Sequence, residues 1–348
     1  MPKIAIVLFN LGGPDGPDAV QPFLFNLFND PAIIDSPKPI RWLLAKFISK
    51  KRAPIAKKIY EHIGGKSPLL ELTHEQGQAL QKRLTATDGQ NQYRVFTAMR
   101  YWHPMSDETA RDVKKFEPDE IVLLPLYPQY STTTTGSSLW DWQQASAKTG
   151  LFAPTFAPCC YAAQQGLLEA HADLIRQTLS KIDREKPFRV LFSAHGLPKK
   201  VIAGGDPYQW QVEQTAAGVM NQLGDAVADW AVCYQSRVGP LEWIGPSTEQ
   251  ELERAADDST AVVVVPIAFV SEHSETLVEL DIEYKAAAEK LGVPAYYRVP
   301  ALGTHPAFIA GLADIVTQAR NGNAALEPAV DGSSCQQQFS CCPRGRPL

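Results

Sequence analysis

Long apolar runs are missing from this sequence, and so is any marked excess of one charge. Its 348 residues carry a formal net charge of −5, which gives no overall positive field to attract nucleic acid. No apolar run approaches the roughly 18 residues that cross a membrane as a helix. The apolar run within Met1–Phe9 is short and precedes a Gly-Gly-Pro turn, so it is typical of a first β-strand rather than of a secretion signal. We expect a cytoplasmic protein that binds no nucleic acid.

Nucleotide-binding fingerprints are missing as well. The segment Gly12–Gly16 follows the first expected strand, but it matches neither the dinucleotide-binding pattern nor the P-loop. Pro14 also lacks the backbone N–H that would hold a phosphate. The segment is better interpreted as a tight turn, or as a wall that a flat ligand approaches closely, and no nucleotide cofactor is expected.

Cysteine is scarce, with six in the chain. In a reducing cytosol, six cysteines favour a metal or redox role over structural disulfides. Cys233 lies in an expected strand and is interpreted as an inert core residue. The others are the adjacent pair Cys159 and Cys160, and the tail residues Cys335, Cys341 and Cys342.

A repeated plan organises the rest of the chain. Apolar strands of the first half, each ending in a polar or Gly/Pro turn, have counterparts in the same order in the second half. The pairs are 7–14 with 190–198, 93–104 with 230–240, and 121–131 with 262–271. Helical patterns lie between the strands, and this alternation predicts parallel βαβ sheets. We predict an α/β protein of two similar flavodoxin-like or Rossmann-like domains, whose parallel sheets face a central cleft. The predicted divisions are 1–160, 161–325 and a Cys-bearing tail at 326–348.

A stripe of carboxylates follows the buried strand expected at Ala261–Val270. On an α-helical wheel Glu272, Glu275, Glu279 and Glu283 fall on one side. Like charges at this spacing repel one another, and active sites of open α/β sheets lie at the carboxyl ends of strands. The stripe is therefore a candidate site for cations or protons, with a solvated helix face as the alternative.

His195 also follows an expected strand, in the segment FSAHGLP. A histidine at this position is a candidate base or metal ligand, or a hydrogen-bonded loop residue. Together with His273, Glu275 and Glu279 it could bind a divalent metal or relay protons. The spacing is not that of a structural zinc site and suggests transient metal handling.

Two further features have more than one interpretation. Residues 38–58 contain eight Lys or Arg and no Asp or Glu, mixed with large apolar residues. Such a segment can lie on an anionic membrane, pack as an ordinary surface helix, or cover a large hydrophobic and acidic ligand. Trp243 and Phe269 either line an apolar slot or belong to the core.

Eight motifs in order over nearly the whole chain, up to about residue 320, resemble those of the ferrochelatase family. They are LFNLGGP (8–14), IGGKSPL (63–69), RYWHP (100–104), YPQYSTTTTGSSL (127–139), FSAHGLP (192–198), GDPY (205–208), YQSRVGPLEWIGP (234–246) and PIAFVSEHSETLVELDIEY (266–284). The resemblance implies a chelatase-like fold and a lyase that inserts Fe²⁺ into protoporphyrin IX.

The resemblance also implies roles for residues. His195 is the central catalytic residue, as base or as Fe²⁺ ligand, opposite Glu275 and Glu279, and His273 belongs to the same cluster. Residues implied to border the macrocycle, its propionates or the pocket lip are Leu11, Arg52, Tyr60, Ser67, Arg100, Tyr101, Trp243 and Phe269. The lip, at about 36–60, can also rest on a membrane.

The tail resembles the Cys-bearing C-terminus of part of the family. There, three tail cysteines and one internal cysteine hold a [2Fe–2S] cluster, which needs four thiolates. The candidate ligands here are Cys335, Cys341 and Cys342 with Cys159 or Cys160. Free thiols, or a different metal, are the alternative.

Three other functions stay open at this point. One is a chelatase that acts on coproporphyrin or sirohydrochlorin. Another is a haem or metal carrier without turnover. The third is a nucleotide-binding protein that uses the Gly12-Gly13 turn.

Overall fold

The computed structural model describes residues 1–183, 185–237, 241–322 and 339–341. Within these residues the chain divides into two compact units. The first contains 1–127, 131–158 and 313–322, and the second contains 128–130, 159–312 and 339–341. The domain boundaries near 160 and 325 stay predictions. None of the helices among the described residues is both long and apolar enough to span a bilayer.

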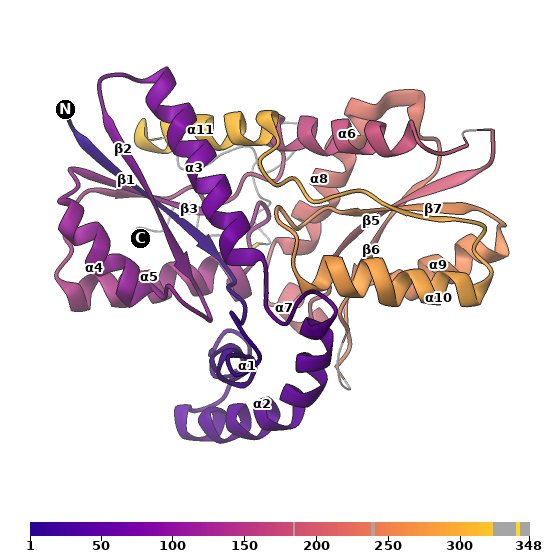
Figure 1. Ribbon diagram of the computed structural model, residues 1–348, viewed down its shortest axis with the longest axis horizontal. Helices are drawn as coiled ribbons and strands as arrows, with labels where there is room; N and C mark the ends of the chain where they lie inside the picture. Colours follow the sequence, from indigo (N-terminus) through magenta and orange to yellow (C-terminus); the bar gives the residue numbers. More distant parts are fainter. Residues whose placement is uncertain (184, 238–240, 323–338, 342–348) are drawn as a thin grey trace. The chain divides into compact units, whose positions relative to one another are not determined.

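Each unit is built on a four-stranded sheet in which every strand pair is parallel (Figure 1). The strand orders are β2-β1-β3-β4 and β6-β5-β7-β8, so the second sheet repeats the first. This confirms the predicted α/β architecture with two similar sheets. The strands are β1 (Lys3–Asn10), β2 (Gln92–Met99), β3 (Glu120–Pro125), β4 (Thr155–Phe156), β5 (Phe188–His195), β6 (Trp230–Gln235), β7 (Ala261–Pro266) and β8 (Tyr296–Arg298).

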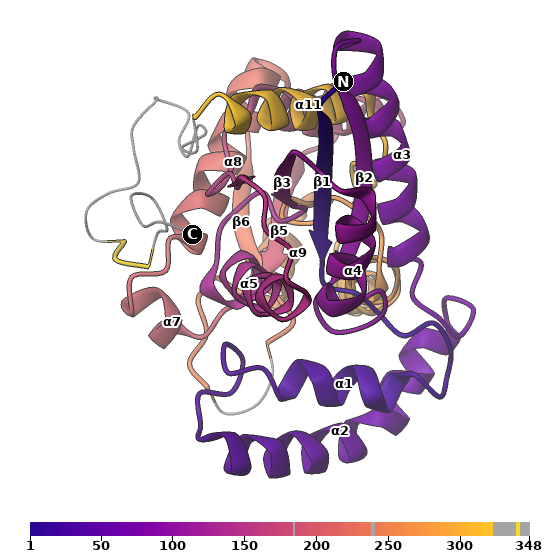
Figure 2. The same ribbon diagram turned by 90° about the vertical axis from the view of Figure 1, so that its left-hand side faces the viewer.

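Helices cover both faces of each sheet, which explains why the central strands are continuous apolar runs. In the first unit, α4 and α5 pack on one face, and α3 packs on the other with Gly77 against Val95 and Leu8. Both views of the ribbon place α1 and α2 side by side beyond the carboxyl end of β1 (Figures 1 and 2). The helices of this unit are α1 (Val20–Phe28), α2 (Lys38–Glu61), α3 (Leu69–Thr87), α4 (Ser106–Phe116), the π-helix η1 (Thr132–Gly136) and α5 (Ser137–Thr149).

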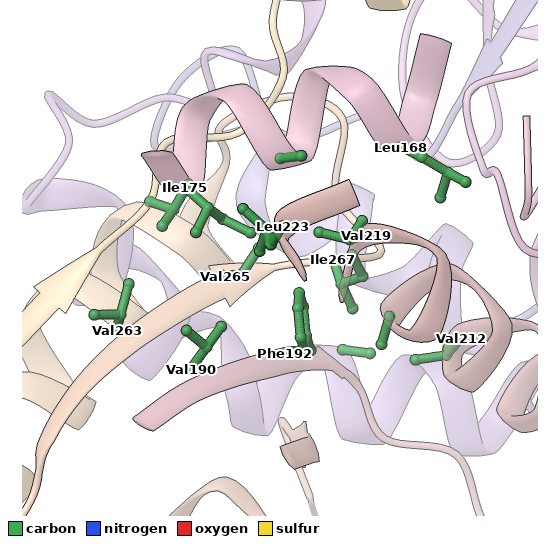
Figure 3. Packing of buried hydrophobic residues seen from close by; sticks show 14 of the residues in the cluster. Leu168, Ile175, Val190, Phe192, Val212, Val219, Leu223, Val263, Val265 and Ile267 are labelled. Carbon is green, nitrogen blue, oxygen red and sulfur yellow. The ribbon is translucent and has the colours of Figure 1, made fainter. Parts of the chain in front are cut away.

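The second unit uses the alternation of β5 to build two cores. Val190, Phe192 and Ala194 face α6 and α8, and Figure 3 shows this packing. Leu191 faces the opposite side, toward α9, η3 and α10. Because side chains two residues apart share a face, His195 lies on the same face as Leu191. The helices are α6 (Gln165–Leu179), α7 (Lys199–Ala203), α8 (Tyr208–Leu223), the 3₁₀-helix η2 (Gly224–Ala226), α9 (Thr248–Asp257), the π-helix η3 (Glu275–Tyr284), α10 (Lys285–Leu291) and α11 (Pro306–Arg320), whose last residues belong to the first unit.

Candidate active site

The carboxyl end of β5 brings His195 against the start of η3. Nδ1 of His195 lies 3.0 Å from Oε2 of Glu275, although the two residues are 80 positions apart in the chain. Both side chains are partly exposed, at 39% and 26%. Nε2 of His195 has no hydrogen-bond partner among the described residues and is available to a ligand.

The charges of this pair stabilise each other. Burial opposes the ionised form of Glu275, but the His195 imidazole outweighs it and lowers the pKa of Glu275 to about 2. Burial likewise opposes the imidazolium, yet the Glu275 carboxylate raises the pKa of His195 above its ordinary value. Opposite charges in contact favour the charged form of both groups.

Glu279 lies one turn further along η3 and is held by the end of β6. Its carboxylate accepts hydrogen bonds from the backbone N–H of Ser236 at 2.8 Å, from Oγ of Ser236 at 2.5 Å and from Nε2 of Gln235 at 3.0 Å. Ser236 has a φ of 62°, in the left-handed region that is uncommon for a residue with a side chain. This backbone turn aims both Ser236 donors at Glu279. Burial, together with the Glu275 charge, raises the pKa of Glu279.

Gln235 links three elements of the site. Its Nε2 also donates to the backbone carbonyl of Glu275 at 3.0 Å, and its Oε1 accepts from Ser193 Oγ at 2.8 Å. The amide therefore ties β5 and β6 to η3 beside His195. The backbones of Gly196 and Gln235 also approach each other closely. Glycine permits this, because a Cβ at position 196 would lie 2.9 Å from the Gln235 carbonyl oxygen.

His273 completes the polar cluster. Its Nε2 lies 3.7 Å from Oε2 of Glu275, and its ring packs against Phe269 with centroids 4.6 Å apart. Burial lowers the pKa of His273. The four residues predicted to carry the chemistry thus lie in one cluster in the second unit.

Trp243 packs beside the same strand end. Its backbone pairs with Pro198 in an isolated bridge, and its ring would lie 3.4 Å from a Cβ added at Gly196. The indole Nε1 is buried without a hydrogen-bond partner among the described residues. Trp243 therefore lies beside the residue that follows His195, and Phe269 lies beside His273.

The α-helical wheel expected for the glutamates is wrong. Residues Glu275–Tyr284 form a π-helix, which has i→i+5 hydrogen bonds and more residues per turn than an α-helix. Glu272 precedes the helix and pairs with Arg298 at 2.7 Å. Glu283 is exposed. Only Glu275 and Glu279 of the predicted stripe belong to the cluster with His195.

In the first unit, Leu11, Tyr60 and Tyr101 meet in one apolar cluster with residues of α1 and α2. Ser67 lies against the Gly-Gly turn, since a Cβ at Gly13 would be only 2.4 Å from the Ser67 Cβ. The turn therefore requires glycine at position 13 because Ser67 approaches it closely.

Arg100 is tied into a buried network that sequence patterns did not reveal. Its Nη2 pairs with Oδ2 of Asp30 at 2.8 Å, and its Nε donates to Ser137 Oγ at 2.7 Å. The hydroxyls of Tyr101 and Ser137 also donate to Asp30, which is 3% exposed. Asp30 stands in a turn sequence, NDPAI, where no spacing or motif marked it.

Arg52 differs from Arg100 because its guanidinium is exposed and lies 5.8 Å from the Phe28 ring on α1. It sits on α2, whose surface exposes many apolar side chains. Those that are at least 39% exposed on α2 are Ile40, Trp42, Leu43, Leu44, Phe47 and Ile55. A basic helix with so much apolar exposure is unusual for a helix that only covers its own domain.

The cysteines are only partly described. Cys159 and Cys160 are buried with their Sγ atoms 3.2 Å apart, too far for a disulfide bond. Cys341 Sγ lies 3.3 Å from the Gly204 carbonyl oxygen. Cys335 and Cys342 lie outside the described residues. Among the described residues no group of three or more His, Cys, Asp or Glu is placed to hold a metal ion.

A cavity of about 390 Å³ lies elsewhere, at the amino ends of the strands in the first unit. Lys3, Tyr93 and Arg94 line it. Sites of parallel sheets form at the carboxyl ends of strands, where His195 lies, so this cavity is not the candidate site.

Comparison with known proteins shows the family of the chain. The family model described as Ferrochelatase matches residues 3–320. The chain is 53% identical to a ferrochelatase of Caulobacter vibrioides over 98% of this chain and 97% of that protein. It is 48% identical to a ferrochelatase of Pelagibacter ubique over 98% of both chains.

Solved structures share the fold. SirB from Bacillus subtilis with Fe³⁺ superposes with a TM-score of 0.55 at 11% identity, over 94% of this chain and all of that chain. At this identity the likeness concerns the fold alone. The family model spans nearly the whole chain, and the relatives are about half identical to it over nearly their full length. Together these matches show that this chain belongs to the ferrochelatase family.

Proposed function

We propose that this ferrochelatase inserts its metal at His195 and Glu275. As a member of its family, the protein is a lyase that inserts Fe²⁺ into protoporphyrin IX to give protohaem, the last step of haem synthesis. The observation that carries the assignment of the site is the 3.0 Å contact between the imidazole and the carboxylate.

The reaction replaces two pyrrole protons with one divalent cation. A base must therefore receive protons close to the macrocycle, and such a base contributes on the order of 10²–10⁴-fold. His195 suits this role because its Nδ1 is held by Glu275 while its Nε2 is free of partners in the described residues. Glu275 keeps the ring oriented and stabilises the imidazolium that forms.

Glu279 is the next acceptor in this proposal. Its pKa is raised while that of Glu275 is lowered, so Glu279 takes up a proton more readily than Glu275 does. Two neighbouring groups whose pKa values are pushed apart are suited to different acid and base roles. His195 and Glu275 also offer the imidazole and carboxylate ligands that a transient Fe²⁺ requires.

A porphyrin is flat and largely apolar, with two carboxylates at one edge. It fits an apolar slot with a few cations at its rim. Leu11, Tyr60 and Tyr101 supply an apolar wall in the first unit, and Arg52 supplies an exposed cation. Because Arg100 is already paired with Asp30, we assign it to holding Tyr101 and the wall in place.

Contact between this wall and the macrocycle is part of the proposal. Trp243 and Phe269 would then contact the macrocycle from the second unit, with Ser67 at the pocket lip. Bending the ring to expose its nitrogen lone pairs would draw roughly 1–5 kcal/mol from binding energy.

The test is anaerobic incubation of the purified protein with Fe²⁺ and protoporphyrin IX. Loss of free-base fluorescence over many turnovers per chain is the expected result. A single stoichiometric loss would instead make the protein a carrier. Parallel assays with coproporphyrin and sirohydrochlorin identify the preferred tetrapyrrole, and absence of thermal stabilisation by nucleotides dismisses a nucleotide site.

We further propose that the tail cysteines hold a [2Fe–2S] cluster. Cys335, Cys341 and Cys342 would provide three thiolates, and one of Cys159 and Cys160 the fourth. What supports this is the donor chemistry: each of these residues carries a thiol, and thiolates are the usual ligands of such clusters. Bound, the cluster would supply an electron-transfer or redox-sensing group.

We also propose that the protein is cytoplasmic and lies against membranes through 38–58. The support is the combination of eight basic residues with the exposed apolar side chains of α2. Apolar burial and attraction to anionic lipid act together in such helices.

A further inference from the structure

Two side chains of the short edge strand β8 hold the π-helix that carries Glu275 and Glu279. Arg298 donates from Nε and Nη2 to the two carboxylate oxygens of Asp281, at 2.5 and 2.7 Å. The hydroxyl of Tyr296 donates to the backbone carbonyl of Leu280 at 2.8 Å. Because residues two apart on a strand share a face, β8 presents both groups to η3.

The same guanidinium reaches the loop before the helix. Nη1 of Arg298 donates to Oε1 of Glu272 at 2.7 Å, and that oxygen also accepts the backbone N–H of Ala301 at 2.9 Å. Glu272 directly precedes His273. Arg298 is only 14% exposed. Its two ion pairs join Glu272 to Asp281, and the segment between these two residues contains Glu275 and Glu279.

This link matters because a π-helix is a rare conformation with poorer geometry than an α-helix. Rewinding η3 toward an α-helix would rotate the glutamates relative to His195 and Ser236. A bidentate arginine–carboxylate pair fixes direction as well as distance, which a lysine cannot do. Groups that act in catalysis must be held to within a fraction of an ångström by surrounding contacts.

We propose that Arg298 is a positioning residue for metal insertion. It fixes the π-helical register through Asp281 and the entry loop through Glu272, and so sets where the two glutamates meet His195 and Ser236. The inference rests on the proposed function, because it concerns the same site. Arg298 itself contacts the carboxylate of neither Glu275 nor Glu279.

The experiment measures kcat and the KM for porphyrin in Arg298→Lys, Asp281→Asn and the double variant. We expect kcat to fall by about tenfold or more in Arg298→Lys, with the porphyrin KM within about twofold of wild type. Because both residues act through one contact, the double variant should be no slower than the slower single variant. If the losses of kcat in the two single variants add up in the double variant, Arg298 does not act through its contact with Asp281. That result would overturn the inference.

Arg189→Lys is the matched control. Arg189 is equally a buried arginine of the second unit that joins two carboxylates, Asp229 at 2.7 Å and Asp258 at 2.8 Å, but it stands at the start of β5. We expect a similar loss of Tm with an unchanged kcat. Equal Tm losses in the two arginine variants, with kcat kept in both, would reduce Arg298 to a structural role.

Tyr296→Phe keeps the test decisive if Arg298→Lys does not fold. It removes one hydroxyl from the same face of β8 and should lower kcat in the same direction, by less. An unchanged kcat in a folded Tyr296→Phe would then count against the inference. A wild-type protein without turnover would refute the proposed function, whereas full turnover in all variants would refute this inference alone.

Discussion

Nδ1 of His195 and Oε2 of Glu275 lie 3.0 Å apart. They meet because η3 packs on the face of the second sheet that carries Leu191 and His195 of β5. The contact leaves Nε2 of the histidine for the substrate. Most of the expected chemistry depends on this pair.

Replacing His195 with Ala removes the proposed base. We expect Fe²⁺ insertion to fall by at least about 10²-fold, while protoporphyrin still binds, because the apolar walls remain. Stopped-flow fluorescence separates porphyrin binding from metal insertion. Turnover close to that of the wild type would remove His195 from the mechanism.

Glu275→Gln should change the pH profile as well as the rate. The Glu275 charge raises the pKa of His195, and the neutral imidazole is the form that accepts a proton. The acidic limb of kcat/KM therefore moves to lower pH in the variant, while kcat falls more than porphyrin affinity. Glu283→Gln, an exposed glutamate of the same helix, is the control and should leave both unchanged. An acidic limb that stays in place would show that His195 is not the titrating group.

His171 should make the fold sensitive to acid. It is 1% exposed, and neither ring nitrogen has a hydrogen-bond partner among the described residues. Burial, with a smaller contribution from His305, lowers the pKa of His171 to about 3. An unfolded histidine titrates near 6.5, so between these values the unfolded chain binds more protons. This residue's contribution to stability is therefore lost as pH falls, by up to roughly 1.4 kcal/mol per pH unit.

His171→Leu removes that dependence. We expect equal or greater stability at about pH 7, because an unpaired buried polar group is replaced by an apolar one, and a shallower loss toward about pH 5. Urea unfolding at both pH values measures the free energies. An identical pH slope in the two proteins would contradict the assignment.

A cluster should be visible in anaerobically purified protein. We expect absorbance in the visible range that disappears in Cys335→Ser and persists in Cys233→Ser, since Cys233 is a core residue with 0% exposure. Equal absorbance in both variants, or none in the wild type, would remove the tail ligands from the proposal.

Membrane binding should depend on the apolar surface of α2. Phe47 is 68% exposed there, and Phe47→Glu should lower binding to anionic vesicles by about tenfold or more in a flotation assay. Phe152→Glu is the control, because Phe152 is 87% exposed in the same unit but lies outside α2. Equal losses of vesicle binding in the two variants would show that binding does not depend specifically on the α2 surface.

Patterns of apolar strands were enough to predict the two sheets, because parallel strands buried on both faces leave continuous apolar runs such as Val262–Val265. The repeated strand order predicted the identical topology of the two sheets. Motifs placed His195, Glu275 and Glu279 together in advance. The sequence pattern wrongly grouped Glu272 with these residues, because a helical wheel assumes one continuous α-helix, whereas Glu272 precedes a π-helix.

The sequence by itself determined the fold class, the family and the residues at strand ends, since these follow from local periodicity and ordered motifs. Only the tertiary structure decided that η3 is a π-helix, that Asp30 holds Arg100 and Tyr101, and that Arg298 joins Glu272 to Asp281. Those contacts join residues 17 to 71 positions apart, so no local pattern encodes them. They exist because buried charges must find partners wherever the fold brings them together.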